Sequence, residues 1–254
     1  MIPIDLSGKI ALVTGGSGQL GREIVRTLAR AGADVAIHYH SNEESAKKRY
    51  DEVVAMGRRA CIVQADVTKE EDVFRMRDEV TAKLGAPDII VNNAVIQYKW
   101  TTILEQPLAD YYSQFESCVI HNVLMAKAFV PAMIEKRWGR VIATNTECAM
   151  QCFPGQSAYV AGKRGLDGII RILAKEVGKY GITVNQVAPG WTISEDRPSP
   201  GTPSEAEYIA RVPLGYRGDA QNIANAVLFL ASDLASYITG LYLPVCGGNE
   251  MPRI

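Results

Sequence analysis

Short, continuously apolar runs alternate along the chain with longer segments whose apolar residues recur every three or four positions. The first run, Ile10–Val13, is typical of a strand buried on both faces, and the periodic segments have the spacing of amphipathic helices. Strands are expected at residues 10–13, 34–39, 60–64, 89–92, 141–144, 183–187 and 241–245. Helices are expected at 22–30, 43–56, 70–84, 110–136, 166–180 and 221–231. Repeated strand–helix units predict a single doubly wound α/β domain of the Rossmann type over residues 1–254, with a parallel seven-stranded sheet and helices on both faces.

Residues 191–218 interrupt this alternation, because they are rich in proline, serine, glycine and charged residues. Irregular segments of this length inside a compact domain are usually functional. The segment also follows a strand end, the edge at which open α/β sheets place their ligands. We therefore expect residues 191–218, called the lid segment below, to form a loop that covers a substrate.

Composition and charge narrow the class of protein. Apolar residues make up 47% and charged residues 22% of the 254 residues, which is ordinary for a globular enzyme. A formal net charge of −1 without a basic tract disfavours nucleic acid or an anionic membrane as the partner. We find no apolar run long enough to span a membrane and no signal-peptide profile, which favours the cytoplasm. Five widely spread cysteines indicate free thiols and no metal site.

A glycine-rich loop connects the first expected strand to the first expected helix. Its sequence is Gly15-Gly16-Ser17-Gly18-Gln19-Leu20-Gly21. A loop without side chains in this setting lets backbone N–H groups and the helix N-terminus approach a pyrophosphate closely. The alternative is a glycine-rich turn that only reverses the chain.

Tyr159 and Lys163 form the candidate for proton chemistry. If the helix that carries the periodic segment 166–180 begins a few residues before Tyr159, the two side chains lie one turn apart on the same face. A nearby ammonium group favours a phenolate, so we expect the pKa of Tyr159 to be lowered toward neutrality. Such a phenol can exchange a proton with an alcohol or an alkoxide. The alternative is an ordinary solvated helix edge.

These motifs, taken in order, resemble the short-chain dehydrogenase/reductase family, in the branch whose chains have about this length. Asp66-Val67, Asn92-Asn93-Ala94, Tyr159 with Lys163, and the segment from Asn185 to Gly190 carry the resemblance together with the glycine loop. It implies the catalytic residues Asn122, Thr146, Tyr159 and Lys163. With the second strand end, it places at the cofactor Gly15, Ser17, Gly18, Gln19, Leu20, Gly21, Tyr39, His40, Ser41, Asp66, Val67, Asn93, Ala94, Val95, Tyr159, Lys163, Pro189, Gly190 and Thr192.

Four positions depart from the family pattern. Gln19 replaces a glycine of the usual loop, although Gly15, Gly18 and Gly21 fit the spacing of the related extended branch. Val95 replaces the glycine after Asn-Asn-Ala, and Cys246 replaces an aspartate before the C-terminal glycine pair. Thr146 stands where the family has its catalytic serine. Threonine keeps the hydroxyl donor and acceptor, so the role can survive, and Thr144 is a less well placed substitute.

The resemblance implies hydride transfer between a nicotinamide and a ketone or secondary alcohol, with Tyr159 as the acid or base. Thr146 would bond the substrate oxygen, Lys163 the nicotinamide ribose, and Asn122 a water linked to Lys163. The second strand ends without the carboxylate that selects NAD, and His40 stands where many NADP-preferring relatives have arginine, with Ser41 beside it. We therefore favour NADP(H) over NAD(H).

The sequence predicts the substrate less closely than it predicts the cofactor. Gln97, Cys148, Phe153 and Trp191 are expected to line its site, which suits an uncharged or partly apolar small carbonyl or alcohol. Arg137 is near a position that acyl-carrier-protein-dependent relatives use for docking, so a 3-oxoacyl thioester stays open. A catalytically silent NAD(P)-binding sensor or scaffold is the competing class. The family also implies a homo-oligomer, a dimer or a tetramer, through the long helices.

Overall fold

The protein is described by a computed structural model of residues 4–252, and residues 1–3 and 253–254 of the expected domain lie outside the described residues. All seven expected strands are present and all pair in parallel. They are β1 (Ile10–Val13), β2 (Asp34–Tyr39), β3 (Ala60–Gln64), β4 (Ile89–Asn92), β5 (Gly139–Thr144), β6 (Ile182–Pro189) and β7 (Tyr242–Val245). The sheet order β3-β2-β1-β4-β5-β6-β7 confirms the predicted doubly wound α/β fold.

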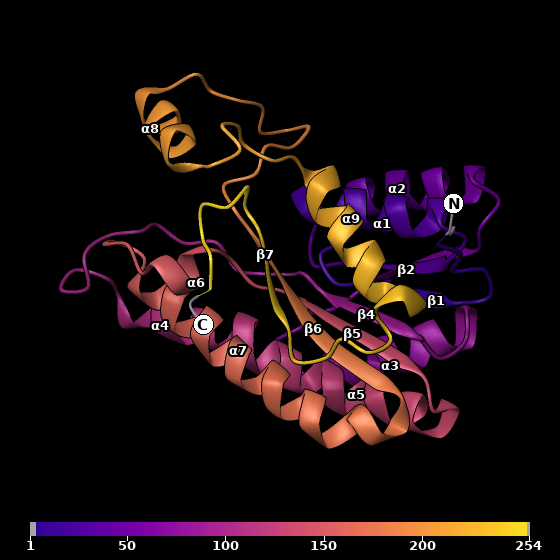
Figure 1. The fold of residues 1–254 in the computed structure, drawn as a ribbon. Coiled ribbons are helices and arrows are strands. Elements are labelled where there is room, and N and C mark those ends of the chain that lie inside the picture. The colour runs from indigo at the N-terminus through magenta and orange to yellow at the C-terminus, as the bar shows by residue number, and fades with distance from the viewer. Residues whose placement is uncertain (1–3, 253–254) are drawn as a thin grey trace.

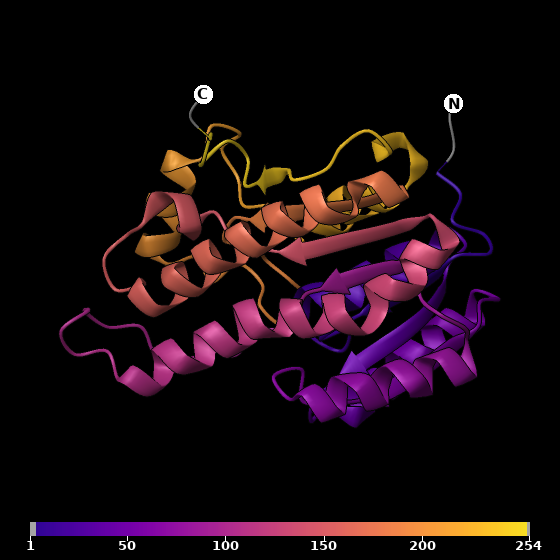
Figure 2. The ribbon, with the colours of Figure 1, turned by 90° about the horizontal axis from the view of Figure 1, so that it is seen from below.

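Helices cover both faces of the sheet (Figure 1). The helices are α1 (Gln19–Arg30), α2 (Glu43–Ala55), α3 (Glu70–Lys83), α4 (Leu108–Phe115), α5 (His121–Lys136), α6 (Cys148–Gln151), α7 (Ser157–Val177), α8 (Pro203–Arg211) and α9 (Ala220–Ala231). Helices α3, α5 and α7 lie on one face, and α1, α2 and α9 lie on the other (Figures 1 and 2). The element order therefore wraps the chain around both sides of one sheet.

Alternating strand residues divide the core into two apolar layers. Leu12, Ile90 and Val141 pack under α3, α5 and α7, whereas their chain neighbours Val13 and Val91 pack under α1 and α9. Because successive strand residues point to opposite faces, a strand covered on both sides is apolar at most of its positions. This is the physical reason that the strands were legible as continuous apolar runs.

The expected helix at 110–136 is interrupted. A π-helical turn, η1 (Glu116–Ile120), separates α4 from α5. The whole run Leu108–Lys136 is long and apolar enough to cross a membrane by length and composition, against our expectation that no segment would be. However, 61% of its most apolar window is buried inside the fold, as in the core helix of a globular protein. Packing against the sheet and α7 accounts for its composition.

The lid segment is not irregular throughout, which corrects the expectation of a loop. Helix α8 occupies residues 203–211 and stands away from the sheet (Figure 1). Thr202 caps its first turn by accepting from the backbone N–H of Glu205, and Pro203 occupies the first helical turn, where a missing N–H does no harm. The lid is therefore a small folded unit at the carboxyl edge of the sheet.

Candidate active site

The strand order reverses between β1 and β4, so the chain leaves these neighbouring strands in opposite directions. Such a switch point opens a crevice at the carboxyl ends of the strands. Asn93, just after β4, donates through its amide to the carbonyl oxygens of Thr14 (3.1 Å) and Gly15 (3.3 Å). The Thr14 hydroxyl in turn accepts from the backbone N–H groups of Asn93 and Ala94. The glycine loop and the Asn-Asn-Ala motif thus form one edge of the crevice.

The glycine loop has the geometry that a pyrophosphate requires. Gly15 has a φ of +63°, which disfavours residues with a side chain. A methyl group at Gly21 would overlap the carbonyl oxygen of Gly15, so only glycine allows α1 to start this close to the strand. Gly18 precedes α1 and caps it with no side chain, which leaves the N–H groups of the first turn available. These residues fit a bound dinucleotide phosphate.

His38 holds the glycine loop from below. Its Nδ1 accepts from the backbone N–H of Gly15 (2.9 Å), and its Nε2 lies 3.0 Å from the carbonyl oxygen of Ala65, which it can bond only as a donor. The side chain is 1% exposed, and burial lowers its pKa to about 4. A neutral imidazole therefore joins β1, β2 and β3 under the loop. This role was not predicted, because it depends on a contact between strands.

The second strand ends as expected at the rim of the crevice. Tyr39 is buried, whereas His40 and Ser41 are exposed. The hydroxyl of Ser45 in α2 donates to the carbonyl oxygen of Ser17, which ties this rim to the glycine loop. Asp66 is directed to its own turn, where it accepts from the backbone and hydroxyl of Thr68.

Helix α7 begins at Ser157, as the Tyr159–Lys163 prediction requires, and places both residues beside the end of β5. The Lys163 ammonium is 3% exposed and donates to the carbonyl oxygen of Thr144 (2.6 Å). Asn145 locks this arrangement, since its amide donates both to the carbonyl oxygen of Lys163 (3.1 Å) and to the side chain of Gln186 (2.6 Å). Lys163 keeps two further N–H donors for a ligand.

Tyr159 lies among aromatic and polar side chains. The Trp100 ring stacks on it with centroids 5.8 Å apart, and the Tyr98 hydroxyl accepts from its backbone N–H. Burial raises the pKa of Tyr159, while a side-chain hydrogen bond with Thr146 lowers it in part. The lowered pKa expected from Lys163 is therefore wrong for this structure: the ammonium lies 5.8 Å from the ring centroid, and desolvation of the phenolate dominates.

Asn122 lies at the start of α5, directly after the π-helical turn. Its amide donates to the carbonyl oxygen of Cys118 (2.8 Å), and its side-chain oxygen accepts from Asn92 (2.7 Å). π-helical turns often occur at functional sites, because they displace a carbonyl group from the regular ladder. The turn and Asn92 fix Asn122 in a buried position.

The residues expected at the substrate are only partly brought together. Gln97 is exposed, Cys148 is half-buried beside Thr146, Phe153 stacks against Arg211 of α8, and Trp191 packs edge-on against Tyr208. A cavity of about 310 Å³ lies at the start of α7, and of the four predicted residues only Phe153 lines it. Trp100, which stacks on Tyr159, was not among the predicted site residues, although its position soon after β4 could have suggested a place at this edge of the sheet. Within residues 4–252, no cluster of His, Cys, Asp or Glu could hold a metal ion.

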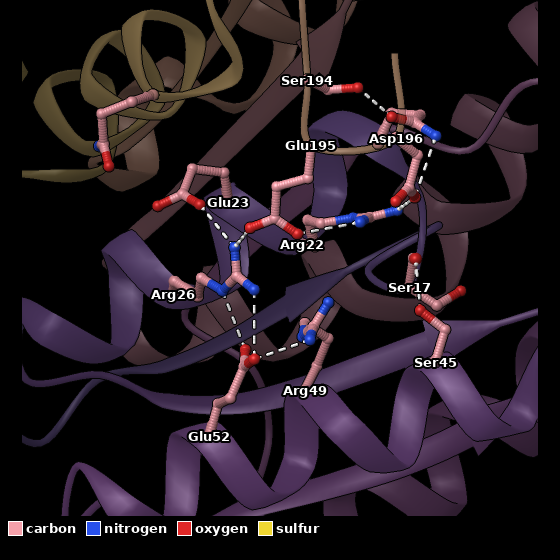
Figure 3. Close-up of polar contacts among 12 residues, drawn as sticks. Ser17, Arg22, Glu23, Arg26, Ser45, Arg49, Glu52, Ser194, Glu195 and Asp196 are labelled. Carbon is pink, nitrogen blue, oxygen red and sulfur yellow. Dashed lines mark hydrogen bonds and ion pairs between the residues drawn. The ribbon is translucent and has the colours of Figure 1, made fainter. Parts of the chain in front are cut away.

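The beginning of the lid is bound to α1 by a cluster of charges (Figure 3). Arg22 pairs with Glu195 (3.1 Å) and with Asp196, and Arg26 also pairs with Glu195. Gln19 adds hydrogen bonds to Ser194 and Asp196. The lid thus crosses the crevice directly above the glycine loop.

Past β6, the chain leaves the sheet through Pro189, Gly190 and Thr192, which the resemblance places at the cofactor. Pro189 ends the strand, the Gly190 N–H donates to the carbonyl oxygen of Val245, and the Thr192 hydroxyl donates to the carbonyl oxygen of Gly190. Val95, at the end of β4, packs against the apolar core under α3, α5 and α7. The candidate cofactor and proton-transfer residues therefore gather along one edge of the sheet.

Comparisons with known proteins agree with this arrangement. Residues 17–250 match the family model described as enoyl-(acyl carrier protein) reductase. The chain is 38% identical over 258 residues to the 3-oxoacyl-[acyl-carrier-protein] reductase FabG of Escherichia coli (strain K12), covering 98% of this chain and 100% of that protein. The structure of a blue fluorescent protein from a metagenomic library in complex with NADPH has a TM-score of 0.90 at 35% identity, covering 97% of this chain and 100% of the other. Levodione reductase has a TM-score of 0.88 at 28% identity, covering 95% and 97%. The chain belongs to the short-chain dehydrogenase/reductase family and is an oxidoreductase that acts on CH–OH and C=O groups with NAD(P).

Proposed function

We propose that the protein interconverts a ketone and a secondary alcohol, with Tyr159 as the group that exchanges the proton with the substrate oxygen. The supporting observation is that α7 places Tyr159 and Lys163 beside the end of β5, where the Lys163 ammonium donates to the carbonyl oxygen of Thr144 and the Tyr159 hydroxyl lies near Thr146. Bound NAD(P) would supply or accept the hydride. The side chains of the protein itself carry out the proton transfer and hold the substrate and the cofactor in place.

Each side chain has one task in this proposal. Tyr159 donates its proton to the oxygen that develops negative charge during reduction, and Thr146 bonds the same oxygen. Lys163, held by the Thr144 carbonyl group, uses its remaining N–H donors on the nicotinamide ribose. The raised pKa of Tyr159 suits the reductive direction, because a protonated phenol is the acid that reduction consumes.

The test replaces Tyr159 by phenylalanine. We expect kcat to fall by about 10²- to 10⁴-fold, the usual contribution of general acid catalysis, while the dissociation constant for the cofactor stays nearly unchanged. Tyr112→Phe is the matched control, since Tyr112 is a 67% exposed tyrosine of α4. Retained turnover in Tyr159→Phe would refute the assignment. A protein that binds the cofactor but turns over no carbonyl or alcohol would instead be a sensor.

We propose NADP(H) as the preferred cofactor. His40 and Ser41 are exposed at the end of β2, and among the described residues of this strand end there is no carboxylate to repel a 2′-phosphate. A related protein of known structure was solved in complex with NADPH. Replacing His40 by alanine should raise the Michaelis constant for NADPH more than that for NADH, and equal changes for both would contradict the proposal.

For the substrate, we propose an uncharged carbonyl compound and include 3-oxoacyl thioesters, on which the relatives with 38% identity act by name. Arg137 does not clearly favour the thioester, because it donates to the carbonyl oxygen of Lys179 and so already has a structural partner. Initial rates on a panel of simple ketones, diketones and a 3-oxoacyl thioester would separate these classes.

A homo-oligomer is the proposed state of assembly. Helices α4 and α7 carry exposed apolar side chains at Leu108, Tyr112, Phe115 and Ile172, which a second copy of the chain would cover. Light scattering after size-exclusion chromatography should give a dimer or tetramer, and Phe115→Glu should shift it toward the monomer. All five cysteines are free thiols, which supports our expectation of the cytoplasm.

A further inference from the structure

A buried carboxylate follows Thr146 directly and is not used in the proposed proton transfer. Glu147 is 3% exposed, and both of its oxygens accept a hydrogen bond. One bond comes from the hydroxyl of Tyr208 in α8 (2.8 Å), and the other comes from the amide of Asn249, after β7 (3.0 Å). The Glu147 backbone N–H also donates to Pro189 at the end of β6 (3.0 Å). Four segments that are distant in sequence therefore meet at this residue.

Tyr208 passes this connection on to the first residue of the lid. Its hydroxyl donates to Glu147 and accepts from the backbone N–H of Trp191 (2.8 Å). Its ring also packs edge-on against the Trp191 indole, with centroids 5.5 Å apart. A tyrosine hydroxyl has one proton. Because Tyr208 donates it in the hydrogen bond to the Glu147 carboxylate, the hydroxyl oxygen is left to accept from the backbone N–H of Trp191.

Arg217 holds the opposite side of the same backbone. Its Nε donates to the carbonyl oxygen of Trp191 (2.8 Å), and an Nη donates to that of Thr192 (3.1 Å). Its other Nη pairs with the buried carboxylate of Glu205 in α8. The peptide at Trp191–Thr192 is thus held on both sides by side chains of the lid, each oriented by a buried carboxylate.

We infer that Glu147 is a positioning residue: acting through Tyr208, it fixes the Trp191–Thr192 backbone against the end of β5. This inference rests on the proposed function, in which Thr146 bonds the substrate oxygen, and on the expectation that Thr192 contacts the cofactor. Because Thr146 and Glu147 are adjacent, one rigid peptide unit links the proposed oxygen contact to the start of the lid. The distance between the two contacts then depends on the Glu147–Tyr208 hydrogen bond, together with the contacts of Arg217 on the other side of the Trp191–Thr192 backbone.

The carboxylate is required for a geometric reason. Two donors reach Glu147 from different segments, and a carboxylate offers an oxygen to each without offering a proton of its own. A glutamine at this position keeps one acceptor for Tyr208 but directs its own N–H₂ toward the Asn249 amide. A leucine removes both acceptors and leaves two buried donors without partners.

The experiment compares Tyr208→Phe, Glu147→Leu and Glu147→Gln with Tyr216→Phe, an exposed tyrosine of the same lid. Hydrogen–deuterium exchange of the full-length protein, read by mass spectrometry, follows the amides at 191–192. Steady-state kinetics follow kcat and the Michaelis constant of the cofactor. Tyr208→Phe is the variant least able to disturb folding, since it loses a single oxygen atom.

We expect faster exchange at 191–192 in Tyr208→Phe and Glu147→Leu, a smaller change in Glu147→Gln, and none in Tyr216→Phe. In the first two variants kcat should fall by about 10- to 100-fold, the effect of a misplacement of about 1 Å, and the Michaelis constant of the cofactor should rise. A smaller fraction of folded protein would lower the apparent kcat but leave the Michaelis constant of the cofactor unchanged. The double variant Tyr208→Phe/Glu147→Leu should be no worse than the poorer single variant.

Unchanged exchange at 191–192 in Tyr208→Phe, or unchanged kinetics despite faster exchange, would overturn the inference. Failure of the proposed function is a different result: the wild-type protein would then turn over no carbonyl or alcohol substrate. The exchange measurement does not depend on turnover, so it still decides whether Glu147 holds the lid.

Discussion

Acid should destabilise the protein through its buried histidines, and His38 allows this effect to be isolated. The chain has three histidines, of which His38 and His121 are buried and His40 is exposed. Burial lowers the pKa of His38 to about 4 and that of His121 to about 3, against an ordinary value of 6.5. Below pH 6.5 the unfolded chain therefore binds more protons than the folded one. Stability is greatest above pH 6.5 and falls as the pH decreases toward 4.

The magnitude follows from the two pKa values of His38. At pH 5 an unfolded histidine is almost fully protonated, whereas one with a folded pKa of about 4 is mostly neutral. The difference lowers the free energy of unfolding by about 2 kcal/mol between pH 8 and pH 5, and His121 adds about as much. A protonated His38 would also present an N–H group to the N–H of Gly15, so the same step loosens the glycine loop.

The assay is urea unfolding of the wild type, His38→Asn and His38→Gln at pH 8 and pH 5, at one protein concentration. Each variant should lose about 2 kcal/mol less than the wild type between the two pH values, because the other titrating groups are shared. The exposed His40→Asn serves as the control and should lose as much as the wild type. An equal loss in wild type and His38→Asn would refute the reasoning.

The two replacements also separate the two hydrogen bonds of His38. Asparagine places an acceptor near the position of Nδ1 and can keep the bond from Gly15, whereas glutamine places a donor near Nε2 and can keep the bond to Ala65. If the glycine loop binds the cofactor phosphates, His38→Asn should keep more cofactor affinity than His38→Gln. Titration of the cofactor fluorescence measures both.

Two further predictions concern the crevice. Gly21→Ala should weaken cofactor binding by about fivefold or more, because its methyl group overlaps the carbonyl oxygen of Gly15 and steric strain of this kind costs about 1 kcal/mol or more. Gly168→Ala, where a methyl group meets open space, is its control, and equal affinities would contradict the prediction. Glu195→Gln with Asp196→Asn should make the lid more sensitive to protease at low salt, because the two changes remove its ion pairs with α1. As salt is added, the protease sensitivity of the wild-type lid should rise toward that of the variant. A difference that does not depend on salt would show that these ion pairs do not hold the lid.

The strands of the sheet were predictable from the sequence because burial on both faces favours short apolar runs. Strand bounds such as Ile89–Asn92 matched the expectation for this reason. The end of α5 was also well placed, since the apolar period continues to it, whereas α7 begins at Ser157, nine residues before the periodic segment that predicted it. Helix α8 was missed although Thr202 and Pro203 together are a readable start signal, because the charged composition around them favoured a loop.

The electrostatics of the site could not be predicted from spacing. Tyr159 and Lys163 are one turn apart as expected, yet the sign of the tyrosine's pKa shift depends on how deeply the phenol is buried. Trp100, which comes from another part of the chain, stacks on the phenol ring and takes part in that burial. The spacing along one helix shows which charges lie near Tyr159. It does not show how far other elements bury the phenol, and burial decides the direction of the pKa shift here.

The four departures from the family pattern lie in different parts of the structure. Gln19, in place of glycine, bonds to Ser194 and Asp196 of the lid. Cys246 lies against Gly190, where the chain leaves the sheet to begin the lid. Val95 packs against the core under α3, α5 and α7, and Thr146 precedes Glu147, whose carboxylate accepts from Tyr208 of α8. Two of the four changes, at Gln19 and Cys246, therefore lie along the path of the lid, whereas Tyr159 and Lys163 match the family pattern.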